Sequence, residues 1–526
     1  MSAGAVISHE QAEGQSWFTS GPAVVWYIAG SVILLQLLTA NRYGYFGDEF
    51  YHMACGEHMA WGYVDQPPLI ALFAWLTRHL FGTSLFSIRL LPALAGLLIV
   101  WLTGRIAREL GGGRFAQALA ALCSACAGVY LILGHLFTMN VFEPLFWMGC
   151  AYVVIRIIKT GNQKLWLWFG VLSGIGLENK YSMAVFGFGI VVGLLLTRER
   201  KAFAGKWIWI AGLIALVIFL PNLIWNVRHD YPFLELMHNI RQSGRDLPFT
   251  PLGYIRAQIL LMTPVTFPVW LLGTLYFFFF SKGSAYRVLG WAFISVLVTF
   301  IVLHGKDYYA TPVYPMMFAG GAIAIERVIA AKRLRWLKPF SVALVLLATV
   351  ALLPLFVPVL SPESFLRYEA KLPFKVQPDE KSMLAEPMPH YYSGCFGWPD
   401  LVRAVAEAYN KVPAQDRADT AIYANDFATA GAIDLLGPKF GLPKAIGAHQ
   451  SYWLWGPRNY TGSTMIVVGG SAEDARKWFD DATVIAQLHN PYTGTAYGWA
   501  HKTVLLCRGK KFTSLTEVWP RLKHWD

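Results

Sequence analysis

Long apolar stretches, separated by shorter polar connections, recur along the first two thirds of the chain. A helix needs about 20 mainly apolar residues to cross the hydrocarbon core of a bilayer. The hydrophobic pattern predicts eleven such helices, of which the fourth, fifth and ninth are shorter than ideal. They are expected at residues 23–40, 84–104, 115–134, 141–158, 165–177, 183–197, 207–225, 253–280, 288–303, 309–326 and 340–360. We therefore expect an α-helical polytopic membrane domain over residues 1–361.

The pattern changes after residue 361, where short β-like runs alternate with helical ones. Strands are predicted at TAIYAND, KAIGAHQ, STMIVVGG, ATVIAQLH and KTVLLCRG. Helices are predicted at FATAGAIDLLG and SAEDARKWFDD, the second of which begins with Ser471 in a capping position. Residues 362–526 are therefore expected to form a separate soluble α/β domain.

Basic residues are concentrated in every second connection between the predicted helices. Five short connections hold seventeen of them: Arg105, Arg108, Arg114, Arg156, Lys159, Lys164, Arg198, Arg200, Lys201, Lys206, Lys282, Arg287, Arg327, Lys332, Arg333, Arg335 and Lys338. The positive-inside rule places these connections in the cytoplasm. The N-terminus is then cytoplasmic and the C-terminal domain extracytoplasmic. The first 23 residues contain no Lys or Arg and no early apolar core, so they do not resemble a cleaved signal peptide.

The composition agrees with a membrane protein. Of the residues, 55% are hydrophobic and only 14% are charged, whereas soluble chains carry about a quarter charged residues. The net charge of +12 comes mainly from short basic runs between apolar stretches, so we expect membrane lipids and no nucleic acid as partners.

Six cysteines occur, in two settings. Cys123 and Cys126 form a CxxC pattern inside an apolar run, where small-residue helix packing is expected in place of redox or zinc chemistry. Cys395 and Cys507 lie in the polar C-terminal part, where they could pair if it faces an oxidising compartment.

Five polar motifs belong to the predicted external side. They are NRYGYFGDEFYHMACGEHMAWGYVDQPPL, GHLFTMNVFEPLFW, LENKYS, NVRHDYPF and HGKDYYATPVYP. Ionisable residues at membrane depth are costly, so their concentration on one side indicates a functional site.

Asp48 and Glu49 are the leading catalytic candidates. Two adjacent carboxylates repel each other, which raises the pKa of one and suits it to accept a proton. They could equally bind a divalent cation, together with Glu143. The alternative for an isolated pair of this kind is an ordinary solvated loop.

Other charged residues of these motifs are candidates for binding. Glu143 could be a second acid, a metal ligand, the partner of a basic residue or a helix-start acid. Lys180 and Lys306 stand apart from other charges, beside tyrosines, which suits a phosphate contact; snorkelling to the interface is the alternative. Arg228 and His229 are weaker candidates, since they open a long loop.

Asp65 precedes two prolines, which hold the backbone extended. The following LIALFAWLTRHLF has helical periodicity with Trp and Phe, typical of a helix lying in the membrane interface. Such a helix is either a plain connection or a wall for a lipid substrate.

Taken together, these motifs resemble those of a known family. GDEFYHMACGEHMAWGYVDQPPL, FEPLFW, GLENKYS, PNLIWNVRHDYP and GKDYYATPVYP are similar to segments of the bacterial family 39-type, dolichyl-phosphate-mannose protein mannosyltransferase-like membrane enzymes. These enzymes have the GT-C fold and are related to protein O-mannosyltransferases and to the lipid A aminoarabinose transferase. In the tail, AGAIDLLG and AHQSYWLWGP are similar to the soluble appendage of some members.

The resemblance implies an activity and a location. One sugar would pass, with inversion, from a polyprenyl-phosphate donor to an acceptor hydroxyl on the external face of the bacterial inner membrane. The acceptor would be a protein, lipid A, a glycolipid or a polysaccharide. No cofactor is implied with certainty, although a divalent cation is possible. The donor contains no nucleotide, which agrees with a sequence that has no phosphate-binding loop or dinucleotide fingerprint.

The resemblance also implies roles for individual residues. Asp48 matches the first-loop acid that activates the acceptor, and Glu49 would orient it or bind a cation. Lys306, with Tyr308 and Tyr309, matches the region that contacts the lipid phosphate, and Lys180 matches another basic position. Many relatives carry Asp where this chain has Glu143, which changes the reach of that carboxylate by about one methylene.

Two other classes of protein are compatible with many spans. A transporter or flippase of a lipid-linked or anionic substrate would show polar residues near mid-membrane and broken helices in paired halves. A membrane anchor that displays its C-terminal domain as a binding module would not explain why carboxylates and lysines gather on the external side.

Overall fold

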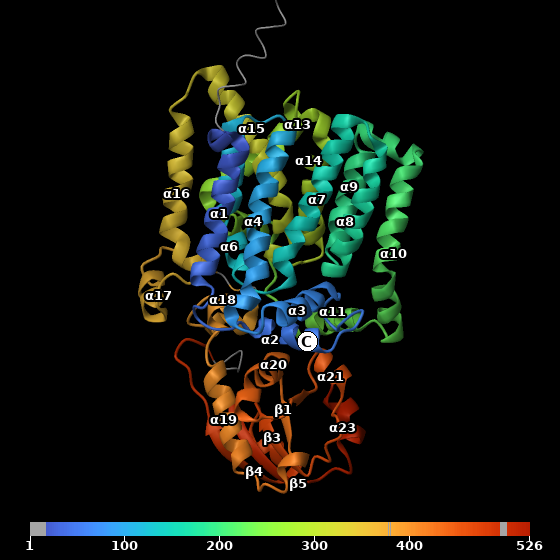
Figure 1. Ribbon diagram of the computed structural model, residues 1–526, viewed down its shortest axis with the longest axis vertical. Coiled ribbons are helices and arrows are strands. Elements are labelled where there is room, and N and C mark those ends of the chain that lie inside the picture. Colours follow the sequence, from blue (N-terminus) through green and yellow to red (C-terminus); the bar gives the residue numbers. More distant parts are fainter. Residues whose placement is uncertain (1–16, 377, 379, 495–501, 526) are drawn as a thin grey trace, which may run out of the picture.

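A computed structural model of the protein describes residues 17–376, 378, 380–494 and 502–525. A bundle of long helices forms one part, and a small sheet domain lies at one end of it (Figure 1). Short helices lie between the two parts.

Within the described residues, seven helices are long and apolar enough to cross a membrane, or up to nine if each of two bent helix pairs counts as one span. The long helices are α1 (Gly21–Thr39), α4 (Leu85–Glu109), α7 (Met139–Thr160), α10 (Lys206–Arg228), α14 (Arg287–Val302), α15 (Tyr314–Lys332) and α16 (Leu337–Phe356). The bent pairs are α5 (Arg114–Ala125) with α6 (Gly128–Gly134), at 61°, and α12 (Pro251–Leu261) with the segment Pro264–Phe279 that contains α13 (Phe267–Phe279), at 100°. The prediction of a polytopic helical membrane protein is confirmed; its count of eleven is not.

The difference in count has two physical causes. The predicted spans at 115–134 and 253–280 have continuous hydropathy, but in each of them the helix backbone is broken. The second break lies at Thr263, which has a φ of +64° and is followed by a proline. The predicted spans at 165–177 and 183–197 form α8 (Trp166–Asn179) and α9 (Met183–Leu195), which have only 14 and 13 residues. Both lie beside the long helices (Figure 1).

Small residues allow several helices of the bundle to approach closely. A Cβ atom on Gly273 of α13 would lie 1.9 Å from the carbonyl oxygen of Met317 on α15. Cys123 and Cys126 are buried and free, as expected of packing residues. Van der Waals contact between small residues is the usual basis of helix association in lipid.

The five basic connections lie at the end of the bundle away from the sheet domain (Figure 1). There Glu109 of α4 pairs with Lys159 of α7 at 3.0 Å. The assignment of this end to the cytoplasm remains a prediction from charge.

Three short helices lie between the bundle and the sheet domain: α2 (Gly47–Glu57), α3 (Leu69–Leu80) and α11 (Pro232–Ser243) (Figure 1). The helix predicted after Asp65 is confirmed as α3. It buries Ile70 and Ala74 and leaves Leu72 and Trp75 38% and 39% exposed, so its surface is amphipathic.

The predicted C-terminal α/β domain is confirmed. Its strands are β1 (Ala421–Ala424), β2 (Ile446–Gly447), β3 (Thr464–Val468), β4 (Phe479–Gln487) and β5 (Thr503–Lys510), in the order β2-β1-β3-β5-β4. β2, β1 and β3 are parallel, and β5 and β4 are antiparallel to their neighbours. One face packs on α19 (Trp398–Asn410) and α20 (Phe427–Leu436); the other packs on α22 (Ala472–Arg476) and α23 (Leu515–Leu522).

Two predictions about this domain need correction. Ser471 caps α22 by accepting a hydrogen bond from the Asp474 amide, but the helix ends at Arg476 because Phe479 already belongs to β4. Cys395 and Cys507 do not pair: both are buried free thiols in separate clusters of the core.

The sheet domain is packed firmly against the short helices. Gly431 of α20 lies so close to α2 that a Cβ atom there would be 2.8 Å from the Phe50 carbonyl carbon. Lys444 pairs with Glu57 of α2 at 2.6 Å. The division of the chain at residues 361 and 362 remains a prediction about separate folding units.

Candidate active site

The turn that leads into α2 positions the two candidate catalytic carboxylates. Gly44 has a φ of +104°, a conformation that favours glycine. Glu49 then closes the start of the helix, because the Phe46 amide donates to its Oε2 at 2.8 Å. The local sequence therefore fixes Glu49 inward and leaves Asp48 on a different side of the helix.

Glu49 is fully buried and has partners on both oxygens. Arg89 of α4 donates from Nε to Oε1 at 3.1 Å and from Nη2 to Oε2 at 3.2 Å. The Phe137 amide also donates to Oε1, at 3.0 Å. A carboxylate that accepts hydrogen bonds from this many donors has little capacity left for substrate or metal.

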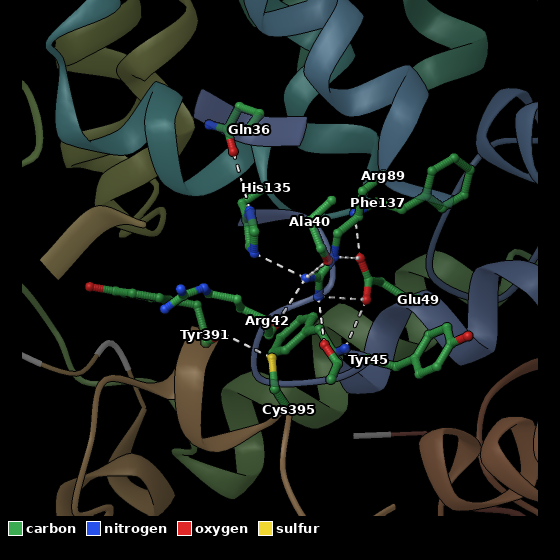
Figure 2. A network of polar contacts seen from close by, with 12 residues as sticks. Gln36, Ala40, Arg42, Tyr45, Glu49, Arg89, His135, Phe137, Tyr391 and Cys395 are labelled. Atoms are coloured by element: carbon green, nitrogen blue, oxygen red, sulfur yellow. Dashed lines mark hydrogen bonds and ion pairs between the residues drawn. The ribbon is translucent and has the colours of Figure 1, made fainter. Parts of the chain in front are cut away.

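Arg89 joins the loop after α1 to the bundle (Figure 2). Its guanidinium donates to the carbonyl oxygens of Ala40, Arg42 and Gly44 at 2.8, 3.3 and 2.7 Å. It also lies 2.9 Å from Nε2 of His135. Arg89 was missed in the sequence, although a single arginine inside an apolar run is a recognised signal of a buried charge pair.

Asp48 differs from its neighbour. It is partly exposed and has no hydrogen bond or ion pair within the part of the chain that the structure describes. Burial and then the charge of Asp65 raise the pKa of Asp48 to about 7, although Lys306 opposes the shift. A carboxyl with a pKa near the working pH and no partner is suited to accept a proton.

Asp65 lies close to Asp48 and contacts the sheet domain through Tyr51. The Tyr51 hydroxyl donates to Asp65 Oδ1 at 2.8 Å and lies 2.7 Å from Ser451 Oγ. Burial raises the pKa of Asp65 to about 6. The sheet domain therefore contributes a residue to the surroundings of the candidate base.

Lys180 is the centre of a second group. Its ammonium donates to Glu143 Oε2 at 3.2 Å and to Asn140 Oδ1 at 2.8 Å. It also lies over the rings of Tyr309 and Tyr308, at 4.3 and 5.4 Å from their centroids. Lys180, Glu143, Tyr308 and Tyr309, which were predicted from three separate motifs, thus lie together.

Lys306 is paired with a residue that the sequence did not single out. Its ammonium donates to Glu380 Oε1 at 2.5 Å, and Arg245 lies 3.6 Å from the same oxygen. Glu380 is buried and follows α17 (Pro362–Glu369) in the segment that leads to the sheet domain. No local pattern could have revealed it, since its partner is 74 residues away in the chain.

Two predicted binding residues, Arg228 and His229, do not belong to the groups around Asp48, Lys180 and Lys306. Arg228 is exposed at the end of α10. The His229 imidazole bonds the Trp225 carbonyl at 2.8 Å and stacks on its ring, so it caps its own helix.

The cation site suggested for Asp48, Glu49 and Glu143 stays a prediction. Within the described residues, no three His, Cys, Asp or Glu side chains converge as metal ligands. Glu49 and Glu143, two of its three predicted ligands, are instead paired with Arg89 and Lys180.

Comparison with known proteins agrees with this architecture. Residues 65–225 match the family model described as dolichyl-phosphate-mannose-protein mannosyltransferase. Over 196 residues the chain is 26% identical to the lipid A galacturonosyltransferase RgtD of Rhizobium johnstonii, a match that spans 37% of this chain and 41% of that relative.

Solved structures extend the similarity to most of the chain. ArnT of Cupriavidus metallidurans, solved with undecaprenyl phosphate bound, has a TM-score of 0.62 at 14% identity, covering 91% of this chain and 97% of that one. The oligosaccharyltransferase of Archaeoglobus fulgidus has a TM-score of 0.51 at 13% identity, covering 80% and 63%.

The protein therefore has the fold of the GT-C membrane glycosyltransferases. Parts of the chain are similar to the dolichyl-phosphate-mannose-protein mannosyltransferase model and to a lipid A galacturonosyltransferase. The family resemblance predicted from the sequence is confirmed.

Proposed function

We propose that this protein transfers one sugar from a polyprenyl-phosphate donor to an acceptor hydroxyl, at the end of the bundle that faces the sheet domain. The observation that carries the proposal is the contrast at the start of α2. Glu49 is paired with Arg89, whereas Asp48 has no partner among the described residues and burial raises its pKa to about 7. This is the arrangement that a base needs when a neighbouring residue holds it in place.

The reaction is a single displacement at the anomeric carbon. Asp48 takes the proton of the acceptor hydroxyl as its oxygen attacks C1 of the sugar. The bond from C1 to the phosphate oxygen breaks, and its electron pair leaves with the polyprenyl phosphate. Attack from the side opposite the leaving group inverts the configuration at C1.

Lys180 and Lys306 are the groups available to stabilise the leaving phosphate. Fixed positive charge placed where negative charge develops is a large contribution to catalysis. Each lysine is balanced by a carboxylate, Glu143 or Glu380. The rings of Tyr308 and Tyr309 lie beside the Lys180 ammonium.

The donor's prenyl chain needs an apolar surface open to lipid. α3 presents such a surface through its exposed Leu72 and Trp75. Since α3 follows Asp65 directly, the lipid wall and the reacting groups belong to one continuous segment.

The acceptor class follows from the relatives. One acts by name on lipid A, and another family description names proteins as acceptors. We infer an acceptor of the lipid A, protein or glycan type, reached in the extracytoplasmic space of a bacterial inner membrane. The fold similarity to glycosyltransferases does not favour a transporter.

The test uses purified full-length protein with isotopically labelled polyprenyl-phosphate sugars and envelope lipid as acceptor. Wild-type protein should release free polyprenyl phosphate and label the acceptor, whereas Asp48→Asn should not. Asp400→Asn is the matched control, because Asp400 is exposed and pairs only with Arg403 on its own helix. Transfer by Asp48→Asn at the wild-type rate would contradict the proposal.

A further inference from the structure

Three carboxyl groups at the reactive end of the bundle have no basic partner within the described residues. They are Asp48, Asp65 and Glu178. Lys180 pairs with Glu143, and Lys306 pairs with Glu380. The proposed mechanism uses only the first of the three.

Glu178 is the most unusual of them. It lies in the last turn of α8, is 8% exposed, and has no hydrogen-bond partner on either carboxyl oxygen. One turn earlier, a Cβ on Gly174 would be 2.8 Å from Ile218 of α10. Residues four apart share a helix face, so Glu178 points toward the next turn of α10, where Asn222 lies.

Tyr181 connects this carboxyl to the rest of the site. Asn226 of α10 donates to the Tyr181 hydroxyl at 3.3 Å. Burial raises the pKa of Tyr181, and the charges of Asp65 and Glu178 raise it further. Both carboxyls therefore lie within electrostatic range of that hydroxyl, one on the side of α2 and one on the side of α8.

The first external loop closes the same region. Asn222 donates to the Trp61 carbonyl at 2.8 Å, and a Cβ on Gly62 would be 2.4 Å from the Trp225 ring. The loop that carries Asp65 is thus held against the helix that faces Glu178.

A buried carboxyl without a partner is costly, and native proteins rarely keep one unless a ligand or water completes its hydrogen bonds. Sugar hydroxyls are donors that match carboxyl, amide and phenol groups. On the basis of the proposed function, we propose that Asp65, Glu178, Tyr181 and Asn226 form the subsite for the donor sugar. This subsite takes a sugar without a carboxylate.

The charge of the subsite sets its specificity. A uronic acid would bring a second negative charge beside Asp65, whereas the buried and partnerless Glu178 favours its protonated, neutral form. Like charges about 6 Å apart, at the effective dielectric of a protein, weaken binding by about 100-fold. Hydroxyl groups carry no such penalty and donate to both carboxyls. In this respect the chain should differ from the relative whose name specifies galacturonic acid.

The test measures binding of three lipids to full-length protein in nanodiscs by native mass spectrometry: polyprenyl phosphate, a polyprenyl-phosphate hexose and the corresponding hexuronate. Wild-type protein should bind the hexose lipid at least about tenfold more tightly than the hexuronate lipid. In Asp65→Asn this ratio should fall at least threefold, while binding of polyprenyl phosphate stays unchanged. Asp400→Asn, at an exposed residue of α19, is the matched control.

Each outcome is decisive. Equal binding of the two sugar lipids by wild-type protein, or an unchanged ratio in Asp65→Asn, would overturn the subsite. Unchanged binding of polyprenyl phosphate shows that the variant is folded. Failure of wild-type protein to bind polyprenyl phosphate at all would instead contradict the proposed function.

Discussion

Adjacent residues of the same type can have opposite roles when one of them has a partner. Asp48 and Glu49 differ by one methylene and one position, yet only Glu49 meets Arg89. The ion pair keeps Glu49 fixed, and it holds the turn from which Asp48 projects. Asp48 has no such partner, so burial and Asp65 control its pKa.

The pH dependence of transfer should follow Asp48. Because the base must be ionised and its pKa is raised to about 7, activity is lost as the pH falls through that value. We expect kcat/KM to be level above pH 8 and to fall about tenfold per unit below pH 6. Initial rates between pH 5 and 9 measure this. A profile that is flat from pH 5 to 8 would show that the base is another group.

Removal of Arg89 should destabilise the protein. Arg89→Met leaves the Glu49 carboxylate buried without its cation, which costs about 3–5 kcal/mol. Thermal melting in detergent should therefore show a large fall in Tm, with loss of transfer. Arg403→Met, at an exposed ion pair on α19, should change stability by less than about 0.5 kcal/mol. Equal melting temperatures for the two variants would be incompatible with a structural role for Arg89.

At the scale of elements, the site depends on how α2 is held between the bundle and α20. Phe50 and Tyr51 belong to the same buried cluster as the inner face of the sheet domain. The close approach at Gly431 sets the distance between the two helices.

A side chain at Gly431 should separate α2 from α20. In Gly431→Val the new Cβ would lie 2.8 Å from the Phe50 backbone, so one helix must shift. We expect at least a tenfold loss of kcat/KM, because misplacement of catalytic groups by about 1 Å is costly. Gly212→Ala is the helical control, since its Cβ would meet nothing within 4 Å. Wild-type kcat/KM in Gly431→Val would show that this contact does not position Asp48.

Elements were predicted from sequence where the signal is local. The long apolar runs, the amphipathic α3 and all five strands follow from periodicity. The break at Thr263 and the short α8 do not, because hydropathy measures composition and not backbone conformation.

The candidate site residues, too, could be predicted only where the signal is local. The sequence singled out Asp48, Lys180 and Lys306, which are charged residues of polar motifs. It did not single out Glu380 and Arg89, because their importance depends on tertiary partners.

At the scale of the whole molecule, the sheet domain is part of the site. Ser451 lies beside the Tyr51 hydroxyl that bonds Asp65, and Glu380 pairs with Lys306. The ion pair between Lys523 and Glu235, at 2.7 Å, joins the end of the chain to α11. The reactive groups therefore lie between two parts of the chain that are hundreds of residues apart.

The most direct test of the central claim is the single-turnover rate of Asp48→Asn with donor already bound. The account predicts donor affinity within about twofold of wild type and a transfer rate at least about 1,000-fold lower, because only the proton acceptor is removed. A transfer rate within tenfold of wild type at equal donor occupancy would contradict the assignment of Asp48 as the base.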